Sequence, residues 1–249
     1  VGCIIGCRFC ESGRLKKVRN LLASEMVLQV LKIEKEINDR ISHIVIMGIG
    51  EPFDNYDNVM QFIYCINEAK GLAIGARHIS VSTSGIVPKI RQLINEKIQI
   101  NLAISLHASN NEVRNKIMKV NHAYNMDQLK EVLVEYCNAT NRRLTFEYIL
   151  LKDINDTSEH AVELAKWLEG TCSYVNLIPY NSVNESSYQR SDEKSMIWTV
   201  NVAPYKVGMV LKEKNDDKQR EIAGMLYSEL NKNNIKCKWC DELIKQLNK

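Results

Sequence analysis

Short apolar strands alternate with amphipathic helices along residues 24–178, and this alternation most constrains the fold. Strands are predicted at residues 43–47, 78–82, 98–106, 143–151 and 173–178. Helices are predicted after Ser24 and at residues 58–69, 87–95, 111–118, 126–140 and 158–168, with Ser24 as the expected N-cap of the first. Apolar strands that connect through helices form a parallel sheet covered by helices. The sequence therefore predicts an α/β fold, either a doubly wound sheet or a partial (β/α) barrel.

Glycine and polar residues follow four of the predicted strands, at the positions where each strand ends. They are Gly48-Ile49-Gly50-Glu51-Pro52, Ser82-Thr83-Ser84-Gly85, Ser105-Leu106-His107 and Pro179-Tyr180-Asn181. In both candidate folds the carboxyl ends of the strands form the ligand site. We therefore expect these four segments to line one binding site.

Cys3, Cys7 and Cys10 form a C-x3-C-x2-C motif with an aromatic residue, Phe9, before the last cysteine. Three thiolates at this spacing can hold three irons of a [4Fe–4S] cluster and leave the fourth iron open. The open iron can bind S-adenosylmethionine (SAM), and reduction then yields a 5′-deoxyadenosyl radical. A structural zinc site is the alternative, and its fourth ligand could come from the Cys237/Cys240 pair.

Three further cysteines, Cys65, Cys137 and Cys172, stand alone inside predicted elements, and we expect them to be small buried apolar residues. Disulfides are disfavoured because the chain is long and lysine-rich and shows no signal peptide. The same features, without an apolar run of about 20 residues, predict no membrane segment and a cytoplasmic location.

The balance of charges constrains the partner only weakly. A net charge of +3 over 249 residues allows a nucleic-acid partner without arguing for one. The basic loop Arg14-Leu-Lys-Lys-Val-Arg19 could bind RNA phosphates or could be an ordinary solvated loop.

Several motifs together resemble the RlmN/Cfr-type radical SAM adenine methyltransferases. The resemblance runs from Val1 to about Arg190, and its stretches occur in the family's order: Val1-Gly-Cys3, Cys7-Arg-Phe-Cys10, Val18-Arg-Asn-Leu21, Met47-Gly-Ile-Gly-Glu-Pro52, Val81-Ser-Thr-Ser-Gly85, Leu102-Ala-Ile-Ser-Leu-His-Ala108, Glu147-Tyr-Ile-Leu150 and Asn176-Leu-Ile-Pro-Tyr-Asn181. It implies a partial (β/α) barrel that holds a [4Fe–4S] cluster on Cys3, Cys7 and Cys10 and binds SAM.

The resemblance also implies site residues and partners. Gly50 and Glu51 match the contact to the methionine amine of SAM, and a carboxylate suits that ammonium group. The other matched SAM positions are Ser82, Ser105, Leu106, His107 and Asn181. The implied substrate is adenine in 23S rRNA, and in tRNA as well, with C2 favoured over C8 because the C2 enzymes are the more widespread branch. The implied electron donor is a protein such as flavodoxin or ferredoxin, and the expected state is a monomer.

In this family a protein cysteine carries the methyl group and a second cysteine resolves the RNA adduct. The carrier normally lies in an Ala-Cys-Gly-Gln-Leu context, which this sequence lacks, and the resolving cysteine lies upstream of the cluster motif. The chain begins within the motif, at Val1, and is interpreted as a fragment without its N-terminal part. Neither catalytic cysteine is therefore assigned. Two alternatives stay open: a core that cleaves SAM without methyl transfer, and a non-catalytic RNA-binding module with structural zinc.

The sequence predicts two parts. Residues 1–190 are expected to form the radical SAM core. Residues 191–249 resemble the start of the anticodon-binding domain of prolyl-tRNA synthetases and are expected to form a small, incomplete α/β segment.

Overall fold

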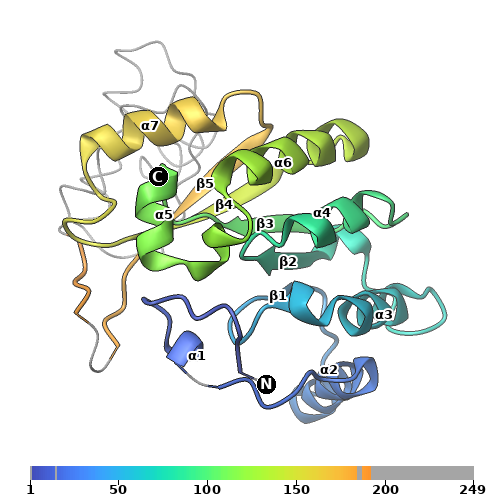
Figure 1. The fold of residues 1–249 in the computed structure, drawn as a ribbon. Coiled ribbons are helices and arrows are strands. Elements are labelled where there is room, and N and C mark those ends of the chain that lie inside the picture. Colours follow the sequence, from blue (N-terminus) through green and yellow to red (C-terminus); the bar gives the residue numbers. More distant parts are fainter. Residues whose placement is uncertain (1, 15, 184–186, 192–249) are drawn as a thin grey trace, which may run out of the picture.

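Five parallel strands form one sheet in the order β1-β2-β3-β4-β5 (Figure 1). The computed structural model describes residues 2–14, 16–183 and 187–191. The strands are β1 (Ile44–Ile46), β2 (Ile79–Thr83), β3 (Asn101–Ser105), β4 (Leu144–Leu150) and β5 (Ser173–Pro179). All five lie within the ranges predicted from the apolar runs or extend them by a single residue.

Helices connect the strands and flank the sheet. They are α2 (Ala23–Ile37), α3 (Tyr56–Asn67), α4 (Val87–Ile94), α5 (Asn111–Ile117), α6 (Met126–Thr140) and α7 (Ser158–Leu168). One short helix, α1 (Glu11–Arg14), and three 3₁₀ turns, η1 (Pro52–Asn55), η2 (Ala76–His78) and η3 (Lys119–His122), were not predicted, because single turns carry no helical periodicity. None of the described helices is long and apolar enough to cross a membrane.

The strand order decides between the two predicted architectures. Each strand pairs in parallel with the strand that follows it in the chain. Crossover connections between parallel strands are right-handed, so a sheet that grows in one direction places all its connecting helices on one face. A doubly wound sheet reverses direction and has helices on both faces. The described sheet is not closed, since β1 and β5 are its two edges. The partial (β/α) barrel is thus confirmed.

The two faces of the sheet differ in chemistry. Alternate residues, such as Val81 on β2, Ile104 on β3 and Phe146 on β4, are at most 1% exposed and pack in the core with the helices. The residues between them point to the other, concave face because side chains alternate along a strand. Those include Ser82, Ser105 and Glu147. The helices therefore cover an apolar face, and the concave face is left polar and available for a ligand.

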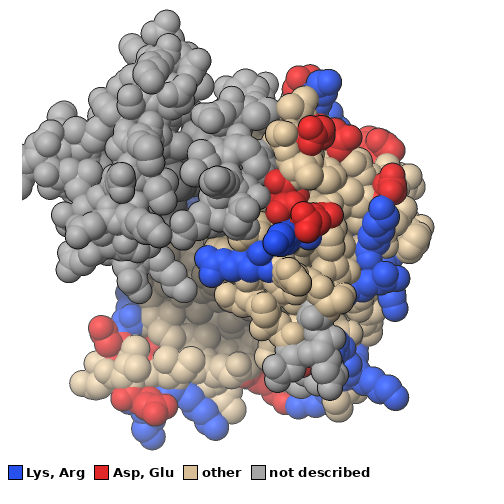
Figure 2. All heavy atoms as spheres, turned by 90° about the vertical axis from the view of Figure 1, so that its left-hand side faces the viewer, with Lys and Arg blue, Asp and Glu red and all other residues tan. Residues whose placement is uncertain are grey.

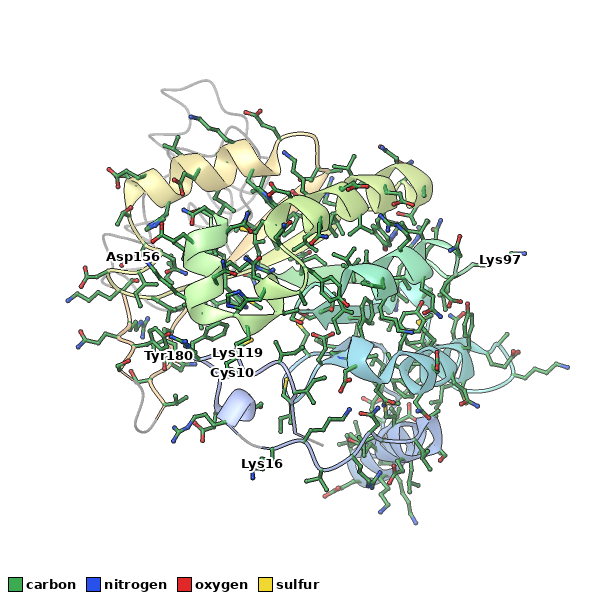
Figure 3. The ribbon with its side chains drawn as sticks, viewed as in Figure 1. Cys10, Lys16, Lys97, Lys119, Asp156 and Tyr180 are labelled. Atoms are coloured by element: carbon green, nitrogen blue, oxygen red, sulfur yellow. The ribbon has the colours of Figure 1, made fainter. Side chains whose placement is uncertain are left out.

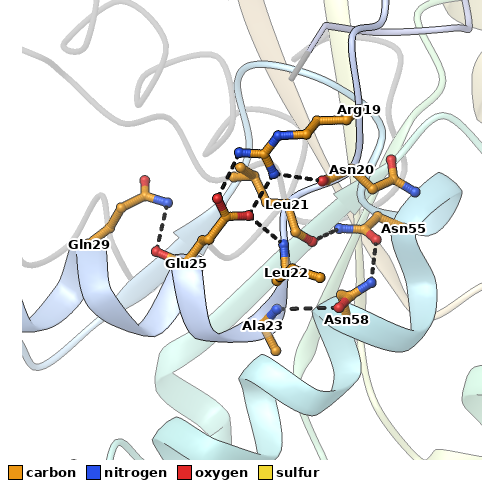
Figure 4. A network of polar contacts seen from close by, with 9 residues as sticks. All are labelled: Arg19, Asn20, Leu21, Leu22, Ala23, Glu25, Gln29, Asn55 and Asn58. Atoms are coloured by element: carbon orange, nitrogen blue, oxygen red, sulfur yellow. Dashed lines mark hydrogen bonds and ion pairs between the residues drawn. The ribbon is translucent and has the colours of Figure 1, made fainter.

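The predicted cap of α2 is wrong by two residues. The N-cap is Leu22, and its backbone N–H donates to the Glu25 carboxylate at 2.8 Å, so Ser24 lies inside the first turn. Figure 4 shows how this start is held: Asn55 donates to the Leu21 carbonyl at 2.8 Å, and the Ala23 N–H donates to Asn58 at 3.3 Å. Contacts with the start of α3, rather than a serine hydroxyl, fix where α2 begins.

The expectation that the isolated cysteines are buried is also wrong for two of them. Cys65 and Cys172 are exposed, and Cys137 is half-buried. Cys65 lies on the outer face of α3, because Phe62, Ile63 and Ile66 occupy the face toward the core. Cys172 lies in the turn directly before β5.

Candidate functional site

The loop that carries the three cysteines is fixed against the carboxyl ends of the strands. The Arg8 N–H donates to the Ile117 carbonyl at the end of α5, at 3.0 Å. Phe9 is buried in an apolar cluster with Ile117, Met118, Val120, Leu151 and Tyr180, and Cys7 and Cys10 pack against the same cluster. Figure 3 shows Cys10, Lys119 and Tyr180 near one another beside α1. The loop therefore lies over α5, η3 and the end of β5.

The three cysteine side chains are free thiols in the described structure. Burial, with smaller contributions from the neighbouring Cys10 and Cys3, raises the pKa of Cys7 to about 12. Burial is also the main reason why the pKa of Cys3 is raised. Each thiol thus lies close enough to its neighbours for their charges to interact, and metal binding here would have to displace protons.

The donor set fits an iron–sulfur cluster better than a single ion. Among the described residues, no three His, Cys, Asp or Glu side chains are arranged to hold one metal ion. Thiolates of a cubane cluster bind three different irons and need not converge on one point. Three neighbouring half-buried thiols, with no fourth ligand among residues 2–14, 16–183 and 187–191, therefore suit a cluster with one open iron.

The Gly-Glu-Pro segment meets the cysteine loop at Gly50. Gly50 has φ of +96°, and a Cβ placed on it would lie 3.1 Å from the Gly2 carbonyl oxygen, so a side chain is disfavoured here. Glu51 is 8% exposed, and its carboxylate accepts hydrogen bonds from the N–H groups of Phe53 at 3.0 Å and Ser84 at 2.7 Å. It therefore caps η1 and ties the end of β1 to the end of β2.

The electrostatic state of Glu51 has opposing causes. Burial raises the pKa of Glu51, and the hydrogen bonds from Ser84 and Phe53 lower it. Each carboxylate oxygen has two lone pairs, so both oxygens can accept a further donor. The geometry fits the ammonium partner that the family resemblance implies and equally explains Glu51 as a structural cap.

A row of polar side chains crosses the concave face near the carboxyl ends of the strands. Ser105 on β3, Glu147 on β4 and Asn176 on β5 lie directly opposite one another in register. Asn176 donates to one Glu147 oxygen at 2.7 Å, and the hydroxyls of Ser82 and Ser105 are 3.3 Å apart. Burial raises the pKa of Glu147. Ser82 and Ser105, both predicted site residues, thus share this surface with a carboxylate and an amide to which no role was assigned.

His107 adopts a backbone conformation that residues other than glycine rarely adopt, with φ of +57°. The N–H groups of Leu106 and His107 both donate to the Glu147 carbonyl, at 3.1 and 3.2 Å, which turns the chain at the end of β3. The His107 ring then accepts the Ile149 N–H at Nδ1, at 3.0 Å, so its proton is on Nε2. Burial lowers the pKa of His107 to about 3, with a smaller contribution from Arg114. The ring packs edge-on against Phe9 at 4.9 Å, linking β3 to the cysteine loop.

Two predicted site residues stand apart from this arrangement. The Leu106 side chain is fully buried in the core, so only its backbone reaches the site. Asn181 is exposed just after β5. Beyond its motif, no feature of the sequence connects Asn181 to the other site residues, and its role stays a prediction. Cys237 and Cys240 lie outside the described residues, as does the predicted 191–249 segment from residue 192 onward.

Sequence reasoning missed two polar residues that organise the site, Arg114 and Asn155. Both are 0% exposed. Arg114 lies between Val113 and Ile117, on the buried side of α5, and Asn155 lies in the turn after β4. Glu147, the one charged residue in the largely apolar strand Leu144–Leu150, was the clearest sequence signal of this kind.

The basic loop after the cysteines is largely paired with acidic side chains. Arg14 contacts Glu11 at 3.4 Å, Lys17 pairs with Asp54, and Arg19 donates to Glu25 at 2.7 Å. Lys16 is exposed and points outward (Figure 3). On the face drawn in Figure 2, Lys and Arg side chains of the described residues lie among Asp and Glu. This arrangement favours an ordinary solvated loop over a strongly basic RNA-binding patch.

Comparison with known proteins gives a consistent result. The model of the radical SAM superfamily matches residues 1–168. The cofactors of this superfamily are a [4Fe–4S] cluster and SAM, in agreement with the three free thiols. In structure, the chain is similar to a radical SAM methyltransferase from Sphaerobacter thermophilus, with a TM-score of 0.79 and 38% identity over 84% of this chain and 63% of that one.

The chain is also similar to curated proteins named as probable dual-specificity RNA methyltransferases RlmN. The Acholeplasma laidlawii protein is 51% identical over 92% of this chain and 68% of its own length. The Spiroplasma citri protein is 55% identical over 77% of this chain, and the chain spans 56% of its length. The Enterococcus faecalis protein is 55% identical over 79% of this chain, and the chain spans 57% of its length. The first of these matches reaches past residue 190, and the assignment of residues 191–249 to a synthetase-like segment stays a prediction. From these matches and the site geometry, the chain belongs to the radical SAM superfamily and, within it, to the RlmN family.

Proposed function

We propose that this chain is the cluster- and SAM-binding core of an enzyme that methylates adenine in 23S rRNA and tRNA, at C2 rather than C8. The observation that carries the proposal is the placement of three free, half-buried thiols over the polar carboxyl edge of the sheet. The names of the relatives support RNA as the substrate. Because the chain spans only part of those relatives, the activity of the whole protein is part of the proposal.

In this proposal Cys3, Cys7 and Cys10 hold three irons of the cluster. When bound, the cluster and SAM supply a carbon-centred radical that can abstract hydrogen from an unreactive C–H bond. Gly50 keeps the backbone free of a side chain where the Gly-Glu-Pro segment meets the cysteine loop. Glu51 accepts the ammonium group of SAM with the lone pairs that Phe53 and Ser84 leave unused.

The remaining site residues orient SAM. The hydroxyls of Ser82 and Ser105 offer donors and acceptors on the concave face. His107 is neutral and has its Nε2–H as a donor, because Nδ1 accepts the Ile149 N–H. The backbone at Leu106 and the side chain of Asn181 complete the set that the family resemblance implies. The proposal further includes reduction by a protein such as flavodoxin or ferredoxin, a monomeric state and a cytoplasmic location.

A second candidate function is SAM cleavage without methyl transfer. It is favoured by the positions of the three other described cysteines. Cys172 precedes β5, and Cys137 near the end of α6 lies close enough to Cys172 for the Cys172 backbone and thiol to act on the pKa of Cys137. Both are therefore at the amino ends of the strands, opposite the site. Cys65 is exposed near the end of α3. None of the three is placed to carry a methyl group to a substrate at the carboxyl edge.

The test is anaerobic reconstitution with iron and sulfide, followed by measurement of iron per chain and of 5′-deoxyadenosine formed from SAM under a strong reductant. The proposal predicts about four irons per chain. Cys7→Ala should abolish both signals, and Cys65→Ala, which removes an exposed cysteine outside the site, should change neither.

Analysis of RNA products then separates the two candidate functions. The intact chain is incubated with 23S rRNA and tRNA, and the digested nucleosides are analysed for 2-methyladenosine and 8-methyladenosine. SAM cleavage without a methylated nucleoside would favour the second candidate. Binding of zinc in place of iron would overturn both and favour an RNA-binding module with structural zinc.

A further inference from the structure

In the part of the chain that the structure describes, the fully buried Arg114 on α5 has only neutral hydrogen-bond acceptors. Its Nε donates to the Leu106 carbonyl at 3.2 Å, and its Nη1 donates to the Asn121 side chain at 3.1 Å. Its Nη2 donates to the carbonyls of Ser84 at 2.6 Å and Ser105 at 3.3 Å. Within the described residues, no carboxylate forms an ion pair with Arg114. The N–H groups of the guanidinium therefore have hydrogen-bond acceptors, but among the described residues no negative charge balances its positive charge.

An uncompensated buried charge is costly, and proteins keep one where an opposite charge is present or will arrive. Burial lowers the pKa of Arg114 to about 10, so the group still carries its positive charge at neutral pH. Asn121, which holds Nη1, is in turn fixed by Asn115 at 2.8 Å and Asn111 at 3.1 Å. A chain of neutral amides and carbonyls thus holds this cation rigidly in place.

The fixed cation lies on the helix that supports the cysteine loop. Arg114 is one turn before Ile117, whose carbonyl accepts the Arg8 N–H of the loop. Cys7 packs against the cluster formed by Ile117 and its neighbours. Cys7 lies close enough to Arg114 for the charges of the two groups to interact. The thiolate that Cys7 becomes when it binds iron can therefore compensate the charge of Arg114.

We propose that Arg114 is the fixed counter-charge of the cluster site and sets how easily the cluster is reduced. The inference rests on the proposed function, since it requires a cluster on Cys3, Cys7 and Cys10. Three thiolates give a [4Fe–4S]²⁺ cluster a net charge of about −1, and reduction adds one more negative charge. One electron enters from an external one-electron donor. No bond at Arg114 forms or breaks, and Arg114 keeps its proton. A positive charge held beside the cluster stabilises the reduced form more than the oxidised form.

The test compares the midpoint potential of the reconstituted cluster in the intact chain, Arg114→Gln and Arg114→Lys, by a redox titration followed by electron paramagnetic resonance. Gln removes the charge, and Lys keeps the charge but loses the planar set of hydrogen bonds. We expect Gln to lower the ratio of reduced to oxidised cluster at a given potential at least tenfold, a shift of about 59 mV for a one-electron couple. Lys should stay within threefold of the intact chain.

Two further variants keep the test decisive. Asn121→Asp places a carboxylate beside Nη1 without removing Arg114, and should lower the ratio in the same direction as Gln. Arg142→Gln is the matched control, since Arg142 is half-buried near the start of β4 and bonds to Asn101 rather than to the site, and should leave the potential unchanged.

The outcomes are distinct. Equal shifts in the Gln and Lys variants, or no shift in Gln or in Asn121→Asp, would mean that Arg114 is only a scaffold and would overturn the inference. If the Arg114→Gln variant fails to retain iron, retention of iron by the Arg114→Lys variant supports a role of the charge. Equal loss of iron from both variants counts against that role. An intact chain that binds no iron would refute the proposed function itself, whereas an intact cluster with an unaltered potential in the variants refutes only the inference.

Discussion

Replacement of Asn155 by alanine should destabilise the fold more than any surface change of the same size. Asn155 is 0% exposed, and its side-chain oxygen accepts the Leu151 N–H at 2.7 Å. Its side-chain nitrogen donates to the carbonyls of His107 at 2.8 Å and Ile149 at 2.7 Å. Three hydrogen bonds therefore join the end of β3, the end of β4 and the following turn through one amide.

The magnitude follows from what alanine leaves behind. It removes three hydrogen bonds worth about 1 kcal/mol each and leaves one N–H and two carbonyls without that partner in a buried region, where each unsatisfied group costs about 1–3 kcal/mol. The loss of a hydrogen bond and the cost of the group left unsatisfied are partly the same free energy and do not simply add. We therefore expect the free energy of unfolding to fall by about 3–5 kcal/mol. For a chain of this size, about 2–4 °C of midpoint per kcal/mol gives a thermal midpoint about 6–20 °C lower.

The assay is urea and thermal unfolding followed by circular dichroism, with refolding checked before free energies are derived. Asn138→Ala is the matched control, because Asn138 is exposed on α6 and alanine favours helix. Asn138→Ala should leave the stability unchanged or raise it by about 0.5 kcal/mol. A loss of less than about 1 kcal/mol in Asn155→Ala would show that water or local rearrangement replaces the amide, and would refute this reasoning.

Three further predictions concern residues of the site. The pKa of His107 is lowered to about 3 in the folded state, so the neutral ring contributes its full stability above the unfolded pKa of about 6.5, and this stability is lost as the pH falls toward 3. In urea titrations, His107→Asn should therefore reduce the slope of the unfolding free energy against pH by up to about 1.4 kcal/mol per pH unit between pH 4 and 6. Glu147→Gln should raise the thermal midpoint at pH 8, because burial raises the pKa of Glu147 and makes its ionised carboxylate costly in the folded state. The same variant should weaken SAM binding measured by calorimetry, and an unchanged SAM affinity would count against a role of Glu147 in the site. Gly85→Ala should cost about 2–4 kcal/mol, since φ is +99° and the new Cβ would lie 3.1 Å from Leu129, whereas Gly75→Ala, with open space around it, should be neutral by the same unfolding assay.

The strands and long helices could be predicted from sequence because burial imposes a repeat on them. In β2 and β3, Val81 and Ile104 face the core and the serines between them face the concave side, a period of two that the residues themselves display. The choice of a partial barrel over a doubly wound sheet required the family resemblance, because periodicity does not encode strand order. Ser24 was misassigned as a cap because the start of α2 depends on Asn55 and Asn58, more than 30 positions away.

The candidate site was predicted unevenly for the same reason. The cysteines and the Gly-Glu-Pro segment can be recognised in the sequence from their spacing and composition. Arg114 does not, because its importance comes from carbonyl groups of Ser84, Ser105 and Leu106, which every sequence supplies. Likewise, the left-handed conformation of His107 and its bond to Ile149 arise from the pairing of β3 with β4. Such features depend on tertiary contacts and become visible only in the folded chain.

The docking of the cysteine loop on α5 has a consequence for the order of events during synthesis. Cys3, Cys7 and Cys10 precede Ile117 by roughly 100 residues, so the Ile117 carbonyl that holds Arg8 is translated about 5–20 s after them at typical rates. Until then, the three thiols have no surface to pack against and are open to oxidants and to competing metal ions. We therefore expect an interval during synthesis in which these thiols are unprotected, because the cysteine loop can take its folded position only after α5 has been made.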